Sequence, residues 1–231
     1  DGEMIPFDVL VIAWGSAPFR TPEFHHAVQA IANMDYPQDL ISLYFGQKVA
    51  PSGYAWIFPN GNKTVKIGLG MDCSHKQNPM DYLGRFVADL NLVENSVISR
   101  LVPTSKPPKS GVVGKTLFVG DSLPACDPLH GGGIINAIIT GRCAGRAIAG
   151  GFPNMYDKYW RRELYGENMR RYRMKKLLYS FRDEDFNMLV STLKEFTPQS
   201  LSIGKEMSRA LLHLAKKAPH LIGKKLISGW L

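Results

Sequence analysis

The chain has 231 residues, of which 45% are hydrophobic and 21% are charged. This balance is ordinary for a folded protein with a sizeable core, and it excludes a disordered or fibrous chain. The formal net charge of +8 attracts phosphate groups, whether of a nucleotide, a nucleic acid or an anionic membrane face. Three scattered cysteines exclude a disulfide framework and predict a reduced, cytoplasmic setting.

Two features concern targeting. No apolar run reaches the ~18 residues of a membrane-spanning helix, since the best stretch, residues 131–151, is interrupted by Arg142 and Arg146. The first residues, Asp1 to Met4, do not resemble a signal peptide. Because residue 1 is not Met, we expect a fragment or a processed product.

The first segments of the chain predict strands. Phe7 to Ala13 is a compact apolar run with the length and β-branched content of a buried strand. Residues 14–22 contain two prolines and a glycine and predict a loop, and Leu40 to Val49 predicts a second strand.

Residues 54–70 give the clearest local pattern. Two alternating apolar runs, 54–59 and 64–70, are separated by a segment that begins with Asn60-Gly61, a pair that tolerates the positive φ of a tight turn. We therefore expect an antiparallel hairpin. Strand alternation places three aromatic side chains on one face of it: Tyr54, Trp56 and Phe58.

The second half predicts more helix. Apolar residues at helical spacing predict a helix over roughly 80–90, a proline-rich connection spans 103–111, and a short buried strand spans 115–120. Beyond Asn154 the chain is strongly helical, with breaks near Thr197-Pro198 and at Pro219. We expect an α+β fold with a mainly antiparallel sheet in residues 1–110, a strand–loop–helix in 111–152 and a helical region in 153–231.

The segment from Leu117 to Gly151 carries the most chemistry. Gly120-Asp121 ends the strand with a carboxylate, and Gly131 to Gly133 lie where a helix begins, so backbone N–H groups can approach a flat ligand closely. The glycine spacing is neither a Walker P-loop nor a GxGxxG fingerprint, and glycines alone also fit a plain tight turn. The helix that follows has small residues three to four apart: Ala137, Gly141, Ala144 and Gly145.

The whole pattern resembles the second FAD-binding motif of the aromatic-hydroxylase-like flavoproteins. Within that superfamily, Asp121 to Pro124 together with Pro128 to Ala137 is most similar to the geranylgeranyl reductase family. Residues 51–59, followed by 65–70, resemble that family's Pro-x-x-Tyr-x-Trp-x-Phe-Pro element. The resemblance covers most of residues 40–159.

This resemblance implies an FAD-dependent reductase that saturates double bonds of geranylgeranyl or polyprenyl chains in archaeal ether lipids. It implies that Asp121 hydrogen-bonds the ribityl chain and that the loop follows the isoalloxazine ring. The implied cofactor-binding residues are Gly120, Asp121, Pro128, Gly131, Gly132, Gly133 and Ile134. The implied substrate-binding residues are Tyr54, Trp56, Phe58 and Pro59. The proton donor stays unassigned, and the electron donor is either NAD(P)H or a ferredoxin-like protein.

Two departures from the family pattern stand out. His130 occupies a position where family members carry a small or hydroxyl residue. The amino-terminal GxGxxG segment is missing, and Ala13 to Ser16 lacks the Asp that the late strand of relatives leads into. The isolated chain is therefore expected to bind FAD weakly or not at all.

Plainer interpretations compete at several positions. Tyr54 and Trp56 fit a ligand pocket and a core equally well, whereas Phe58 fits the core better. His25-His26 predicts surface residues and no metal site, and His130 fits a surface loop better than a proton donor. Cys126 and Cys143 are predicted to be small buried fillers.

The last residues alternate apolar side chains with lysines. This pattern fits an amphipathic helix on an anionic membrane. A solvated helix packed on the domain explains it too and is somewhat more common, but the implied lipid substrate favours membrane contact. The arginines between 161 and 173 accompany no recognised nucleic-acid fold, so no nucleic-acid partner is expected. Apolar residues of this tail are Met207, Leu211, Leu214, Leu221, Ile222, Leu226 and Trp230.

Two other functions remain open at this point. One is an FAD-dependent monooxygenase or halogenase, because those enzymes share the Gly-Asp and Gly-Gly elements. The other is a non-catalytic protein that binds prenyl lipids and has lost its nucleotide-binding half. The lipid substrate favours a cytoplasmic location with peripheral membrane contact.

Overall fold

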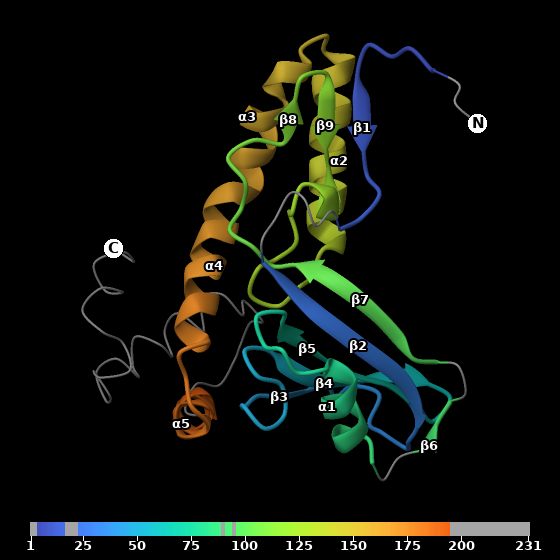
Figure 1. The fold of residues 1–231 in the computed structure, drawn as a ribbon, viewed down its shortest axis with the longest axis vertical. Helices are drawn as coiled ribbons and strands as arrows, with labels where there is room; N and C mark the ends of the chain where they lie inside the picture. Colours follow the sequence, from blue (N-terminus) through green and yellow to red (C-terminus); the bar gives the residue numbers. More distant parts are fainter. Residues whose placement is uncertain (1–3, 17–22, 89–90, 94–95, 195–231) are drawn as a thin grey trace.

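The computed structural model describes residues 4–16, 23–88, 91–93 and 96–194. Figure 1 shows a large sheet below, a small sheet with the long helix α2 above, and a column of helices that runs down beside both. This is the expected α+β architecture, with a mainly antiparallel sheet, a strand–loop–helix and a helical end. The domain boundaries at residues 110 and 152 stay a prediction.

The large sheet has the order β3-β4-β5-β2-β6, and β7 also pairs with β2. All of its pairings are antiparallel, and β2 is the central strand, with β5 on one side and β6 and β7 on the other. The strands are β2 (Phe24–Asn33), β3 (Ser42–Tyr44), β4 (Tyr54–Gly61), β5 (Thr64–Asp72), β6 (Asn91–Leu92) and β7 (Ile98–Pro103).

One face of this sheet is the core of the lower region. Helix α1 (Pro79–Phe86) covers it and buries Leu83 against strand residues such as Val28, Ile67 and Leu69, all at most 1% exposed. The Asn78 side chain accepts a hydrogen bond from the Met80 backbone N–H at 3.0 Å and so caps the helix. The predicted helix over 80–90 is thus confirmed, with an earlier end.

Within the described residues, α1 leaves the opposite face uncovered, and this face carries the aromatic side chains. Tyr54, Trp56 and Phe58 are all partly exposed, while Ala55 and Ile57 between them are buried. The expected shared face is confirmed, but the prediction that Phe58 belongs to the core is wrong, because α1 covers the other face. Trp56 lies across Gly68 of the neighbouring strand, where a Cβ would come within 2.6 Å of its indole ring.

The hairpin forms as expected, but its turn lies two residues later. Asn62 and Lys63 have positive φ angles of 48° and 55°, and Gly61 (φ 78°) still pairs with Thr64. The register shifts between Pro59 and Gly61, as at a β-bulge. Proline offers no N–H to the ladder, so a bulge after it restores the pairing, and glycine accepts the required φ.

Other strand predictions need correction. The predicted strand Leu40 to Val49 shrinks to β3, because Gly46 (φ 132°) starts a turn in which Ala50 N–H donates to the Gly46 carbonyl at 3.0 Å. The sequence reasoning missed β2 and β7 altogether. Alanine at the buried positions of β2, such as Ala30 and Ala32, made its alternation hard to recognise.

The small sheet has the order β1-β9-β8 and is formed by β1 (Leu10–Ile12), β8 (Val112–Val113) and β9 (Thr116–Phe118). Strand β9 confirms the strand expected at 115–120. Strand β1 runs parallel to β9, but the buried strand predicted at Phe7 to Ala13 is shorter and lies at the sheet edge. Leu10 and Val11 are consequently 38% and 40% exposed.

The helices confirm a helical region beyond Asn154. Trp160 and Tyr156 anchor it, 2% and 0% exposed, against the small sheet and α2. Helix α2 spans Ile134–Ala149, and the helical region after it consists of η3 (Pro153–Met155), α3 (Tyr156–Trp160), the π-helical η4 (Arg161–Tyr165), α4 (Gly166–Leu178) and α5 (Asp183–Lys194). Among the described residues, no helix is long and apolar enough to span a membrane. The breaks predicted at 197–198 and 219 and the basic tail lie outside the described residues.

Two glycine substitutions test how closely Trp56 packs on the sheet. We expect Gly68→Ala to lower the free energy of unfolding by about 1–3 kcal/mol, because its Cβ would meet the Val28 carbonyl at 2.5 Å and the indole at 2.6 Å. Gly84→Ala is the control, since no atom lies within 4 Å of its Cβ and alanine favours helix. Urea denaturation measures both, and equal stabilities would contradict this packing.

Candidate functional site

The candidate site begins where the chain leaves β9 and enters the short helix η2 (Gly120–Ser122). Gly120 has a φ of 57°, and a Cβ there would lie 3.2 Å from the Ala137 Cβ on α2. Its backbone N–H donates to Thr140 Oγ1 at 2.9 Å. Glycine is therefore needed at position 120, both for the left-handed backbone and for the close approach to α2.

Asp121 lies at the start of α2. A Cβ on Gly133 would be 3.0 Å from Asp121 Oδ1, so glycine lets the carboxylate reach the helix terminus. Within the described part of the chain, the Asp121 side chain makes no hydrogen bond or ion pair, and burial raises its pKa. The Gly133 N-cap also provides no side-chain hydrogen bond to the first turn. The Asp121 carboxylate, a hydrogen-bond acceptor, thus lies beside the N–H donors of the first turn of α2, to which no side chain of the N-cap is hydrogen-bonded.

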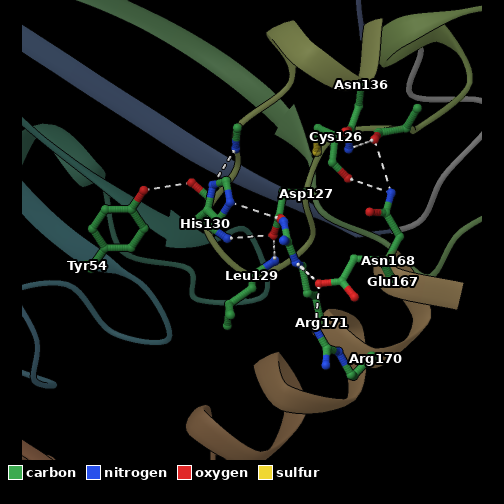
Figure 2. Close-up of polar contacts among 12 residues, drawn as sticks. Tyr54, Cys126, Asp127, Leu129, His130, Asn136, Glu167, Asn168, Arg170 and Arg171 are labelled. Atoms are coloured by element: carbon green, nitrogen blue, oxygen red, sulfur yellow. Dashed lines mark hydrogen bonds and ion pairs between the residues drawn. The ribbon is translucent and has the colours of Figure 1, made fainter. Parts of the chain in front are cut away.

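The loop between them is organised by Asp127 (Figure 2), whose side chain is only 2% exposed. Its Oδ1 accepts hydrogen bonds from the backbone N–H groups of Leu129 at 2.8 Å and His130 at 3.2 Å. Its backbone N–H donates to the Gly132 carbonyl at 2.8 Å, and its carbonyl accepts from Gly131 at 2.9 Å. The sequence reasoning missed this residue, although Asp before a turn commonly binds backbone two residues later.

Helix α4 holds the loop from the other side (Figure 2). Arg171 pairs with Asp127 Oδ2, and its Nε donates to Glu167 Oε1 at 2.8 Å. Asn168 Nδ2 donates to the Ala125 carbonyl at 3.2 Å. A buried carboxylate costs several kcal/mol unless it is paired, so Arg171 and the loop N–H groups together allow Asp127 to be buried.

The aromatic face meets this loop at one point. The Tyr54 hydroxyl donates to the His130 carbonyl at 2.7 Å. From there the ring contacts continue to Trp56 at 5.6 Å and to Phe58 at 5.8 Å, measured between centroids. On the other side of Tyr54, Phe45 lies 6.0 Å away and stacks on Phe186 of α5.

A buried polar cluster lies where β2 and β7 meet α4. Lys175 is fully buried, and its Nζ donates to the Thr104 carbonyl at 2.7 Å and to Thr104 Oγ1 at 3.0 Å. His25 Nδ1 lies 2.6 Å from the same Oγ1, and its Nε2 contacts the Ser52 carbonyl at 2.9 Å. The expectation that His25 is a surface residue is therefore wrong, because β2 was not recognised as the central strand.

The predicted cofactor residues gather in one place, around the loop and the start of α2. A hollow of about 450 Å³ there is lined by Gly132, Gly133 and Ile134 together with Glu163 and Arg171. The predicted substrate residues are more spread. Tyr54 contacts the loop, whereas Pro59, five residues further along β4, lies roughly 16 Å away at 3.3 Å per strand residue.

The structure also places the cysteines and the His130 side chain, for which the sequence predicted no functional role. Cys126 and Cys143 are buried, at 2% exposure each, and burial raises the pKa of both thiols. The His130 side chain is 52% exposed, as expected for a surface loop. Among the described residues, no three His, Cys, Asp or Glu side chains come close enough to hold a metal ion.

The partly buried His25 predicts a pH dependence of stability. Burial lowers its pKa to about 4 in the folded protein, against an ordinary value near 6.5. Between these pH values the unfolded chain binds a proton that the folded chain does not, so the free energy of unfolding falls as the pH drops from 6.5 to 4. Urea titrations across this range should show a smaller fall for His25→Gln. Equal slopes would contradict the partly buried neutral histidine, and a titration at pH 7.5 checks that the variant folds.

Comparison with known proteins adds to this geometry. Residues 24–102, which include the large sheet except the last residue of β7, match the model of the geranylgeranyl reductase catalytic domain. A digeranylgeranylglycerophospholipid reductase of Methanospirillum hungatei is 33% identical over 181 residues, which are 71% of this chain and 45% of that protein. A second such reductase, from Methanothermobacter thermautotrophicus, is 31% identical over 88% of this chain and 55% of its own length. The chain spans about half the length of these curated relatives.

Two solved structures resemble this chain in fold. A geranylgeranyl bacteriochlorophyll reductase-like protein of Thermoplasma acidophilum matches with a TM-score of 0.76 and 26% identity, over 89% of this chain and 55% of that one. HpxO of Klebsiella pneumoniae, solved with FAD and uric acid, has a TM-score of 0.58 at 14% identity over 88% of this chain and 60% of its own, which shows a shared fold. Over the part that it shares with these relatives, the chain belongs to the geranylgeranyl reductase family.

Proposed function

We propose that this chain provides the ring-side cofactor contacts and the prenyl-binding face of an FAD-dependent reductase that saturates prenyl chains of membrane lipids. The observation that carries the proposal is the hydrogen bond from Tyr54 to the His130 carbonyl at 2.7 Å, which joins the aromatic face to the glycine loop. Alkene reduction requires the lipid and the cofactor to meet, and here the elements suited to each are in contact. The names of the curated relatives support a phospholipid with geranylgeranyl chains as the substrate class.

The residues around α2 fit FAD. The Asp121 carboxylate is an acceptor suited to the hydroxyl groups of the ribityl chain, and the N–H groups of the first turn are donors suited to the polar edge of the ring. Ile134 and Ile135, 80% and 67% exposed, offer apolar surface beside them. When bound, reduced FAD supplies the hydride for alkene reduction.

The residues of the aromatic face fit a prenyl chain. The Tyr54 hydroxyl and the Trp56 N–H, which donates to Gln29 Oε1 at 3.3 Å, already have partners, so their rings can present apolar surface without an unsatisfied polar group. A prenyl chain along this face would be directed toward the loop and shielded from water. A membrane-embedded substrate and a net charge of +8 also favour peripheral contact with anionic lipid, in the cytoplasm.

Cofactor binding is tested by the absorption spectrum of the purified chain with added FAD. Because the affinity expected from the sequence is weak, we expect the wild type to shift the flavin band only at high FAD concentration. We expect at least about tenfold weaker binding for Gly133→Val, because its side chain would displace Asp121 and cover the first turn, which is equivalent to about 1.4 kcal/mol. Gly141→Ala is the matched control on the same helix, with no atom within 4 Å of its Cβ. A wild type without a flavin shift even at high FAD concentration, or equal affinities in all three proteins, would contradict the cofactor site.

Lipid binding is tested with micelles of a geranylgeranyl phospholipid. Trp56→Ala should weaken binding about tenfold to a hundredfold, the loss expected when an aromatic contact worth ~1.5–3 kcal/mol is removed. Val113→Ala, which changes an exposed side chain of the small sheet, serves as the control and should bind like the wild type. Circular dichroism confirms folding, and unchanged binding by Trp56→Ala would place the prenyl chain elsewhere.

A further inference from the structure

His130 makes contacts in three directions (Figure 2). Its ring Nδ1 lies 3.1 Å from the Gly132 backbone N–H, which donates to it. Its Nε2 lies 3.0 Å from Asp127 Oδ2. Its carbonyl accepts the hydroxyl of Tyr54 at 2.7 Å. One residue therefore joins the glycine loop, the buried carboxylate and the aromatic face.

These contacts define the protonation state of the ring. An Nδ1 that accepts a hydrogen bond from Gly132 bears no proton, so the neutral ring carries its proton on Nε2 and donates it to Asp127. The ring also packs closely on the loop, because a Cβ on Gly132 would lie 2.6 Å from His130 Cε1. Glycine at position 132 thus allows the ring to close over the backbone.

The contact of the His130 ring with the loop determines which backbone N–H groups stay available to a ligand. The N–H of Gly131 donates to the Asp127 carbonyl at 2.9 Å, and the N–H of Gly132 donates to His130, so both are used inside the loop. The donors that remain for a ligand are those of the first turn of α2, beside Asp121. The shape of the loop, and hence the direction of these donors, depends on the His130 contact.

We propose that neutral His130 is a positioning residue, whose ring holds the glycine loop in the conformation that leaves the first turn of α2 open to the cofactor. This deepens the proposed function and rests on it. Protonation of Nδ1 turns the acceptor into a donor that faces the Gly132 N–H, so the loop is released and cofactor affinity falls in acid.

The surroundings of His130 agree with a neutral ring at neutral pH. The charged and titratable groups that face it are Asp127, Arg171 and Glu167 from the loop and α4, and Tyr54 from β4. Asp127 already pairs with Arg171, which limits its attraction for a second cation. The partial loss of solvent around the ring lowers the pKa of His130, which also favours the neutral form.

Two conservative variants separate the two ring nitrogens. The amide of His130→Asn lies at the position of Nδ1 and can accept the Gly132 N–H, whereas the amide of His130→Gln lies at the position of Nε2 and cannot. At pH 7.5 we expect His130→Asn to bind FAD within about threefold of the wild type. We expect His130→Gln to bind about tenfold more weakly, which corresponds to one net hydrogen bond. Quenching of flavin fluorescence measures both affinities.

The pH profile and a cofactor-free measurement complete the test. From pH 8 to 5 the wild type should lose affinity, and His130→Asn should lose less, because asparagine has no ring nitrogen that can be protonated. Hydrogen exchange of the Gly132 amide, measured without FAD, should be slow in the wild type and in His130→Asn and fast in His130→Gln.

The outcomes are distinguishable. If the wild type binds no FAD, the proposed cofactor site fails, and the Gly132 exchange rates still decide whether His130 holds the loop. If the wild type binds FAD while both variants share its affinity, pH profile and exchange rates, the positioning role of His130 is overturned. Thermal unfolding of each variant confirms that the comparison is made on folded protein.

Discussion

The site depends on the burial of one carboxylate. Asp127 is 2% exposed at the centre of a loop rich in glycine, and such a charge is stable only with several partners. Arg171 of α4 and the backbone N–H groups of Leu129 and His130 provide them. The same interactions connect the loop to α4. The start of α2 and the helical region therefore form one unit, and Tyr54 of the large sheet contacts it at the His130 carbonyl.

The large sheet contributes the aromatic face of Tyr54, Trp56 and Phe58, on which the small residue Gly68 lets the Trp56 ring lie close to the sheet. Gly68 lies beneath the Trp56 indole, and any side chain there would push the ring away from the sheet. Helix α1 fills the opposite face, so the apolar surface on the Trp56 side has no equivalent cover among the described elements. This asymmetry supports the proposal that the face binds a prenyl chain. The face lies within the segment that matches the geranylgeranyl reductase catalytic domain.

Sequence reasoning identified the local patterns and missed the long-range ones. The hairpin and the segment from Gly120 to Ile134 were recognised because turn residues and glycines have strong local preferences. The Asp127–Arg171 pair joins residues 44 positions apart, and His25 became partly buried only because β2 is central, so neither left a local signal. The hairpin turn lies at Asn62 and Lys63, two residues later than predicted, because the register shifts after Pro59. The alternation of apolar residues in the sequence does not reveal such a shift.

The central claim is that the aromatic face and the glycine loop form one site in which lipid and flavin meet. The most direct measurement is a difference spectrum of FAD bound to the protein, recorded before and after addition of a geranylgeranyl phospholipid. A single site predicts that the lipid perturbs the bound flavin band, with a saturation curve that follows lipid binding. If both ligands bind and the flavin spectrum does not change, the two surfaces act separately and the claim is wrong.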